Sequence, residues 1–177
     1  MRQQTNFRDN PFARLACGMA ALCAGLFLQS AASAETPEHF LKSFANFKFA
    51  YHEKVQDPEV FLATQSGDCD DFATLAAGVL QQSGYDTELY AVRMAGETHV
   101  VCYVPAIKGY LDYNNRADAD PVVPCDGSLS DIARKVANSF GREWRSAYQF
   151  SYRQKIKWLV NSIVVNPLVK ETLVAGK

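Results

Sequence analysis

The feature that most constrains the fold is a change of hydrophobic period in the middle of the chain. From Cys69 to about Gly84, apolar residues recur at helical spacing, and Gly84 suits the left-handed position that ends many helices. The next two segments, 88–94 and 99–104, alternate between apolar and polar residues, which is typical of strands. An amphipathic helix beside strands must bury its apolar face on them. The sequence therefore predicts a helix packed on an antiparallel sheet.

The remaining segments fit the same α+β class. Residues 36–64 carry apolar positions at helical spacing in short pieces, so we expect short helices there. A third strand is expected at 109–113, followed by a loop at 114–127 that is rich in Asp, Asn and Pro. A C-terminal helix and a hairpin are expected within 128–165. We find no repeat and no long linker in the sequence, so we expect one domain.

The first 34 residues have the layout of a secretory signal peptide. Three arginines precede an apolar run at 15–28, and the stretch 29–34 ends in a small-x-small pattern. We therefore expect cleavage after Ala34, a mature domain at 35–177 and a periplasmic or secreted protein. A membrane anchor is the alternative, but the run is shorter than the roughly 20 residues that a spanning helix needs. We expect no membrane span in the mature chain.

Composition narrows the classes of function. Hydrophobic residues make up 48% and charged residues 21%, which is typical of a globular chain and not of a disordered one. The formal net charge of −1 lacks the basic excess of a nucleic-acid-binding protein, so no nucleic-acid partner is expected. After the predicted cleavage the cysteines are Cys69, Cys102 and Cys125. They lack Cys-x-x-Cys spacing, so we do not expect a zinc site.

Cys69 is the strongest candidate for a nucleophile. It follows a turn that contains Gly67, at the expected start of a helix, where unpaired N–H groups and the helix dipole favour an anion. Negative charge on Asp68, Asp70 and Asp71 opposes a thiolate at this position. Cys69 therefore needs a partner that accepts its proton, and histidine is the side chain suited to that near neutral pH.

His99 is the only histidine after Cys69, while His39 and His52 precede it in stretches with no other catalytic feature. A tight hairpin would bring the next strand beside His99, with Asp112 or Asn114 opposite it. Such a residue would hold the imidazole tautomer and stabilise the imidazolium. Asp112 has the matching charge and is the first candidate. Asn114 is the second.

The candidate site also needs donors for an oxyanion. The backbone N–H of Cys69 is one natural donor. Gln65, four residues earlier on the turn, is a candidate for the second. A solvated loop glutamine is the alternative interpretation of Gln65.

These residues resemble a known family. The block Ser66-Gly67-Asp68-Cys69-Asp70-Asp71-Phe72-Ala73 is similar to the Gly-Asp-Cys block of the bacterial transglutaminase-like cysteine proteinases. Downstream, Thr98-His99-Val100-Val101 and Gly109-Tyr110-Leu111-Asp112 resemble the family's histidine and Leu-Asp strands in the same chain order. The resemblance covers roughly residues 40–115, and residues 128–177 carry no motif of the family.

The resemblance implies a transglutaminase-like, papain-related core and thiol chemistry on an acyl group. Cys69 would attack, His99 would act as base and then as acid, and Asp112 would orient His99. Exported proteins of this kind are expected to be peptidases or amidases acting on a peptide or protein substrate. An acyltransferase that uses the same thioester is one alternative, and a binding module without turnover is another.

No cofactor is required by this chemistry, but the resemblance makes calcium a candidate ligand. Some members of the family bind calcium through acids beside the cysteine, which here are Asp70 and Asp71. The alternative is that acids in a first helical turn simply favour the helix dipole.

The other two cysteines are candidates for a disulfide. Cys102 and Cys125 would enclose a loop of about 24 residues and leave Cys69 free, which also resolves the odd cysteine count. Alternation along the strand places Cys102 on the face opposite to His99. The alternative is that Cys102 is a small buried hydrophobe and Cys125 a loop residue.

Overall fold

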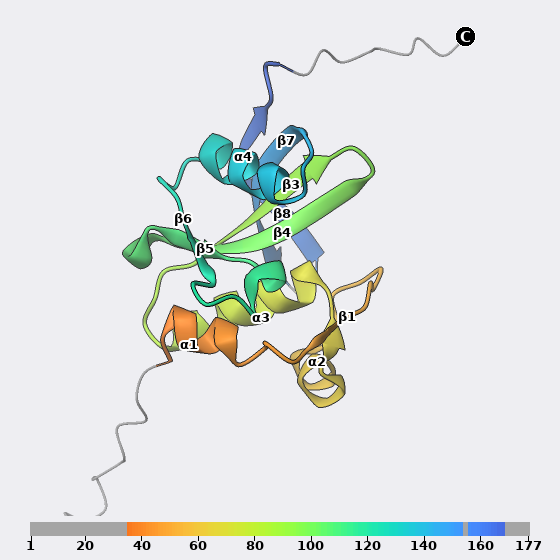
Figure 1. The fold of residues 1–177 in the computed structure, drawn as a ribbon, viewed down its shortest axis with the longest axis vertical. Helices are drawn as coiled ribbons and strands as arrows, with labels where there is room; N and C mark the ends of the chain where they lie inside the picture. Colours follow the sequence, from red (N-terminus) through yellow and green to blue (C-terminus); the bar gives the residue numbers. More distant parts are fainter. Residues whose placement is uncertain (1–34, 154–155, 169–177) are drawn as a thin grey trace, which may run out of the picture. The chain divides into compact units, whose positions relative to one another are not determined.

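The computed structural model describes residues 35–153 and 156–168 (Figure 1). The chain divides into two units, Met1–Ala34 and Glu35–Lys177, and every described residue belongs to the second. The predicted signal peptide, with its cleavage site after Ala34, therefore lies outside the described residues. The second unit combines helices with an antiparallel sheet, as expected for an α+β fold.

Six strands of the described residues form one sheet in the order β6-β5-β4-β3-β7-β8, and all neighbouring pairs are antiparallel. The strands are β3 (Glu88–Met94), β4 (Glu97–Val104), β5 (Gly109–Leu111), β6 (Val122–Pro124), β7 (Trp144–Arg153) and β8 (Ile156–Val165). The predicted strands at 88–94 and 156–165 are confirmed. The third strand ends earlier than predicted, at Leu111, because the Asp112 side chain accepts the N–H of Asn114 and begins a 3-10 turn.

Helices cover both faces of this sheet (Figure 1). Two short helices, α1 (Pro37–Lys42) and α2 (Pro58–Thr64), precede α3 (Cys69–Gln82), and α4 (Leu129–Ser139) follows the sheet's first four strands. In Figure 1, α3 and α1 lie on one side of the sheet and α4 on the other. The helix predicted to begin at Cys69 is thus confirmed, as is a helix within 128–165.

Each face of the sheet has its own hydrophobic core. On the α3 side, phenylalanines from the helical segments pack on Ala91, Val100 and Cys102 of the central strands. On the α4 side, Ile132 and Val136 pack on the opposite faces of the same strands. Cys102 therefore lies on the face predicted for it, in the core beneath α3.

A second, two-stranded sheet holds the chain that leads to α3. Strand β1 (Lys48–Phe49) runs parallel to β2 (Ser66–Gly67). The Lys48 N–H donates to the Gln65 carbonyl at 2.9 Å, and the Ala50 N–H donates to the Gly67 carbonyl at 2.8 Å. The short helices expected within 36–64 are found as α1 and α2, and the 48–56 stretch between them is not helical, because hydrogen bonds to β2 and α3 decide its conformation.

Gly67 occupies a position with no room for a side chain. A Cβ there would lie 2.6 Å from Asp71 Oδ2 and 2.6 Å from the Phe61 ring. Both neighbours are buried, so neither can move aside without disturbing the start of α3. We therefore expect Gly67→Ala to lower the free energy of unfolding by about 1–3 kcal/mol, measured by urea denaturation.

Gly78 provides the matched control for this prediction. It lies on the exposed side of α3, with no atom of another segment within 4 Å of a Cβ position. Gly78→Ala should raise stability by up to about 1 kcal/mol, because alanine is the better helix former. A Gly67→Ala variant as stable as the Gly78→Ala variant would contradict the crowding at Gly67.

Candidate active site

The start of α3 is built by two aspartates that cap it. Asp68 is the N-cap residue and forms a capping box with Asp71, whose Oδ2 accepts the Asp68 N–H at 3.1 Å. Cys69 is therefore the first residue of the helix, where backbone N–H groups have no partner within the helix. The Cys69 side chain is half-buried.

The same two carboxylates hold the preceding segment against the helix. Asp68 Oδ2 accepts the His52 N–H at 2.8 Å. Asp71 Oδ1 accepts the Gln56 N–H, and Asp71 Oδ2 accepts the Gln56 side-chain amide, both at 2.6 Å. Residues 52–56 are thereby fixed beside Cys69, although they are 13 or more positions away in the sequence.

His99 is buried and hydrogen-bonded to Asp112. His99 Nε2 lies 2.8 Å from Asp112 Oδ1, and the two side chains are only 3% and 2% exposed. The backbone N–H of Asn114 donates to the same Oδ1 at 2.9 Å and fixes the carboxylate. Of the two candidates for this position, the structure brings Asp112 to His99, while the Asn114 side chain is exposed.

Cys69 is the other partner of His99. Burial alone would lower the pKa of His99, but the charge and hydrogen bond of Asp112, together with the Cys69 side chain, raise this pKa to about 10. Since Asp112 occupies Nε2, the second ring nitrogen is available to Cys69. The His99 ring also packs against Phe140, with ring centroids 4.9 Å apart. The structure thus brings together Cys69, His99 and Asp112.

Cys69 and His99 open onto a cavity of about 710 Å³. Its walls include the 49–53 segment, the first residues of α3, and Gly96 with the start of β4. This volume lies in the range of sites for small ligands or a few residues of a peptide. The arrangement can bring a thiol, an imidazole and a carbonyl compound together in one cavity.

Gln65 does not belong to this cavity. It ends α2 in a left-handed conformation, with a φ of 50°, and its side chain is exposed. Gln65 is not among the residues that line the cavity, and its role as an oxyanion donor stays a prediction. His52, which the sequence analysis set aside, lines the cavity instead.

The candidate disulfide between Cys102 and Cys125 is not formed. Both are free thiols, and they belong to the cores on opposite faces of the sheet. Cys125 directly follows β6, which β5 separates from the β4 strand of Cys102, so their backbones are about 10 Å apart. A disulfide needs Cα atoms within about 7 Å. Burial raises the pKa of the Cys102 thiol to about 12, so this thiol is unreactive.

The acids beside Cys69 bear on the question of calcium. Carboxylate oxygens of Asp68, Asp70 and Asp71 lie within 4.8 Å of one another. Asp71 already uses both of its oxygens as hydrogen-bond acceptors, whereas Asp68 Oδ1 is buried and has no hydrogen-bond partner among the described residues. Oxygen donors of this kind suit calcium. The cluster fits such an ion with Asp68, which the sequence analysis did not name, as a ligand.

Comparison with known proteins adds no family. No family model matches the chain, and no curated protein matches it. Among the described residues, no helix is both long enough and apolar enough to cross a membrane.

The contacts of His99 predict its titration. In the wild-type protein the imidazole should remain protonated at neutral pH and titrate near pH 10, which NMR of the ring protons would measure. Asp112→Asn should lower this pKa, because it removes the charge that stabilises the imidazolium. Since the folded-state pKa lies above the ordinary value of 6.5, the interaction stabilises the fold below pH 6.5. That contribution is lost as the pH rises through about 10.

Asn114→Ala is the control for this titration. It retains the backbone N–H that binds Asp112, so the pKa of His99 should stay where it is in the wild type. A wild-type His99 that titrates near pH 6.5 would contradict the pairing with Asp112.

Proposed function

We propose that the protein is an exported cysteine hydrolase, a peptidase or amidase, that acts through a thioester on Cys69. The observation that carries the proposal is the buried His99 imidazole, held 2.8 Å from Asp112 and in contact with the Cys69 side chain at the wall of a cavity. A buried, raised-pKa histidine beside a thiol at a helix start is the arrangement that activates a cysteine nucleophile.

The reaction would proceed in two stages. The Cys69 sulfur attacks the substrate carbonyl carbon, and the His99 imidazolium donates its proton to the leaving nitrogen as the C–N bond breaks. A water molecule then attacks the thioester carbonyl, His99 accepts its proton, and the carboxylic acid product leaves with Cys69 regenerated. Asp112 holds the ring and stabilises its charged form throughout.

The helix start would also assist the oxyanion. The Cys69 N–H is a first-turn amide of α3, and such amides have no acceptor within the helix. Together with the helix dipole, it can stabilise negative charge on the carbonyl oxygen. This geometry allows either water or an amine to accept the acyl group. An assay that identifies the product in the presence of an added primary amine therefore separates hydrolysis from acyl transfer.

The finer fold and the location are also part of this proposal. A helix that begins at Cys69 and packs on a sheet, with His99 on β4 and Asp112 directly after the neighbouring β5, supports a transglutaminase-like, papain-related core. Substrate peptides or proteins would be met in the periplasm or outside the cell, since the first 34 residues have the pattern of a cleaved leader.

A calcium ion at the helix start would be held by Asp68 and Asp70. When bound, its positive charge would offset the carboxylates around Cys69 and favour the thiolate. The hydrolytic steps themselves need only the side chains of the chain.

Alkylation by iodoacetamide at pH 6 tests the nucleophile directly, because an ordinary thiol is almost fully protonated there. Cys69 should react quickly in the wild type, and His99→Ala should slow this reaction at least tenfold. Cys69→Ala should abolish hydrolysis while leaving the circular dichroism spectrum unchanged. Its two remaining thiols in the described residues, Cys102 and Cys125, are both buried and should stay unlabelled in peptide mapping by mass spectrometry. Equal labelling of Cys69 with and without His99 would favour a binding module.

Calcium removal tests the acidic cluster separately. If Asp68 and Asp70 hold calcium, a saturating concentration of 100 times the Kd adds about 2.7 kcal/mol to the stability, and a chelator removes it. Asp70→Asn should abolish this difference in Tm. Asp86→Asn, on an exposed residue far from the cluster, should preserve it. A Tm that is the same in calcium and in chelator would exclude the ion from this cluster.

A further inference from the structure

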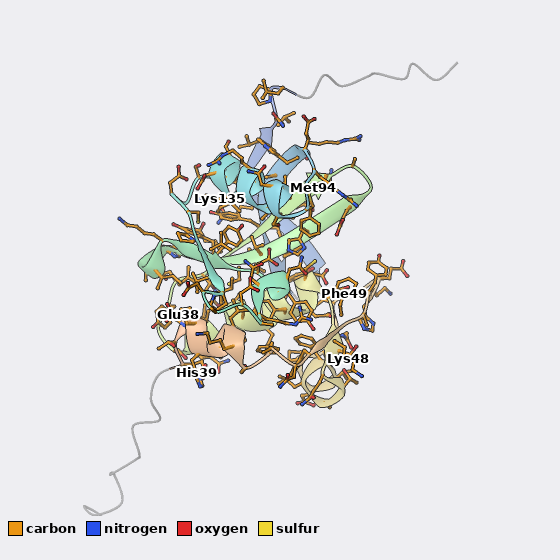
Figure 2. The ribbon with its side chains drawn as sticks, viewed as in Figure 1. Glu38, His39, Lys48, Phe49, Met94 and Lys135 are labelled. Carbon is orange, nitrogen blue, oxygen red and sulfur yellow. The ribbon has the colours of Figure 1, made fainter. Side chains whose placement is uncertain are left out.

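Two aromatic side chains are unusually exposed at the mouth of the cavity. Phe49 is 62% exposed and Tyr51 is 77% exposed, and both line the cavity that contains Cys69. Figure 2 labels Phe49 near the start of α3, with Lys48 on another side of β1. Large aromatic side chains are usually buried, so exposed ones that line a cavity mark a binding surface. Hydrogen bonds from β1 to β2 fix the backbone beneath them.

The same cavity is strongly acidic. The carboxylates that line it belong to Glu53, Asp68, Asp70 and Glu97. Among the described residues no lysine or arginine lines it, and Glu97 is paired at 3.0 Å with Arg142, which lies outside the lining. Asp68 is 3% exposed, and its Oδ1 is buried without a hydrogen-bond partner in the described part of the chain. The charge of this cavity therefore favours a cation.

Phe49, Tyr51 and Glu53 occupy alternate positions of one segment, and all three line the cavity. We propose that they bind a basic side chain, arginine or lysine, of the substrate next to the scissile bond. This inference rests on the proposed function, because it names the substrate class of the same site. Aromatic faces attract a guanidinium or ammonium group through their quadrupole. A carboxylate beside them adds a charge-assisted hydrogen bond, which favours the planar guanidinium.

This assignment distinguishes an organic cation from a metal ion. A metal would use the oxygens around the start of α3 and would leave the exposed rings of Phe49 and Tyr51 without a role. A basic side chain uses the rings and Glu53 together. The nearby basic residue Lys54 does not line this cavity; it lines a neighbouring one, which shares Glu53 and Asp70 with it.

The test compares two blocked tripeptides, acetyl-Gly-Arg-Gly amide and its citrulline analogue, which has nearly the same shape but no charge. Each is titrated into the reduced wild-type protein and followed by NMR, with a chelator present so that calcium does not occupy the carboxylates. The arginine peptide should bind about tenfold more tightly and shift the resonances of residues 49–53 and Cys69. Its advantage should shrink as salt is added.

Two charge-neutralising variants complete the design. Glu53→Gln should remove most of the preference for arginine, whereas Glu59→Gln, on the exposed first turn of α2 and outside the cavity, should leave the preference intact. Equal binding of the two peptides, shifts confined to another surface, or a preference that survives Glu53→Gln would overturn the inference. The titration measures binding alone and therefore tests only the preference for arginine. The proposed hydrolase function is tested separately, and it fails if the alkylation of Cys69 does not depend on His99.

Discussion

The capping of α3 by Asp68 and Asp71 is the interaction on which the rest of the candidate site depends. The two carboxylates satisfy N–H groups at the helix start and, at the same time, those of His52 and Gln56. Unpaired backbone groups at a buried helix end would be costly, so these bonds both begin the helix at Cys69 and close the chain over it. The same two carboxylates therefore position both Cys69 and the 52–56 segment at the cavity wall. One of them, Asp71, also fills the space beside Gly67.

The pair of His99 and Asp112 is a second constraint, of a different kind. Taking two charged groups out of water costs several kcal/mol, and their attraction recovers this only when hydrogen bonds complete the geometry. Here the Asn114 N–H and the 2.8 Å contact provide those bonds. An apolar pair of similar size would stabilise the sheet as well or better, so a buried ion pair at a cavity wall is better explained by chemistry than by stability.

Cys69 lies between negatively charged carboxylates and a positively charged imidazole. Acids that cap the helix also disfavour a thiolate, and the protonated His99 offsets them. Glu53 also lines the cavity, where a positively charged ligand would balance its carboxylate.

The local features of this fold can be predicted from the amino-acid sequence alone. The helix from Cys69, the paired strands around His99 and the nearness of Asp112 follow from hydrophobic period, a glycine-bearing turn and a short hairpin, all of which act over a few residues. The face taken by Cys102 follows from strand alternation in the same way. These predictions depend on backbone geometry that neighbouring residues specify without help from the rest of the chain.

Contacts between segments that are distant in the sequence are not predicted by any local pattern. Short helices form on both sides of the 48–56 segment, but hydrogen bonds across 15 to 17 residues, to the β2 region and to the carboxylates that cap α3, keep the segment itself from being helical and place His52 at the cavity. Cys125 was separated from Cys102 by the order of strands in the sheet, which no local pattern specifies. Such contacts depend on which surfaces pack together when the chain folds. The free energy of that packing comes from residues far apart in the sequence.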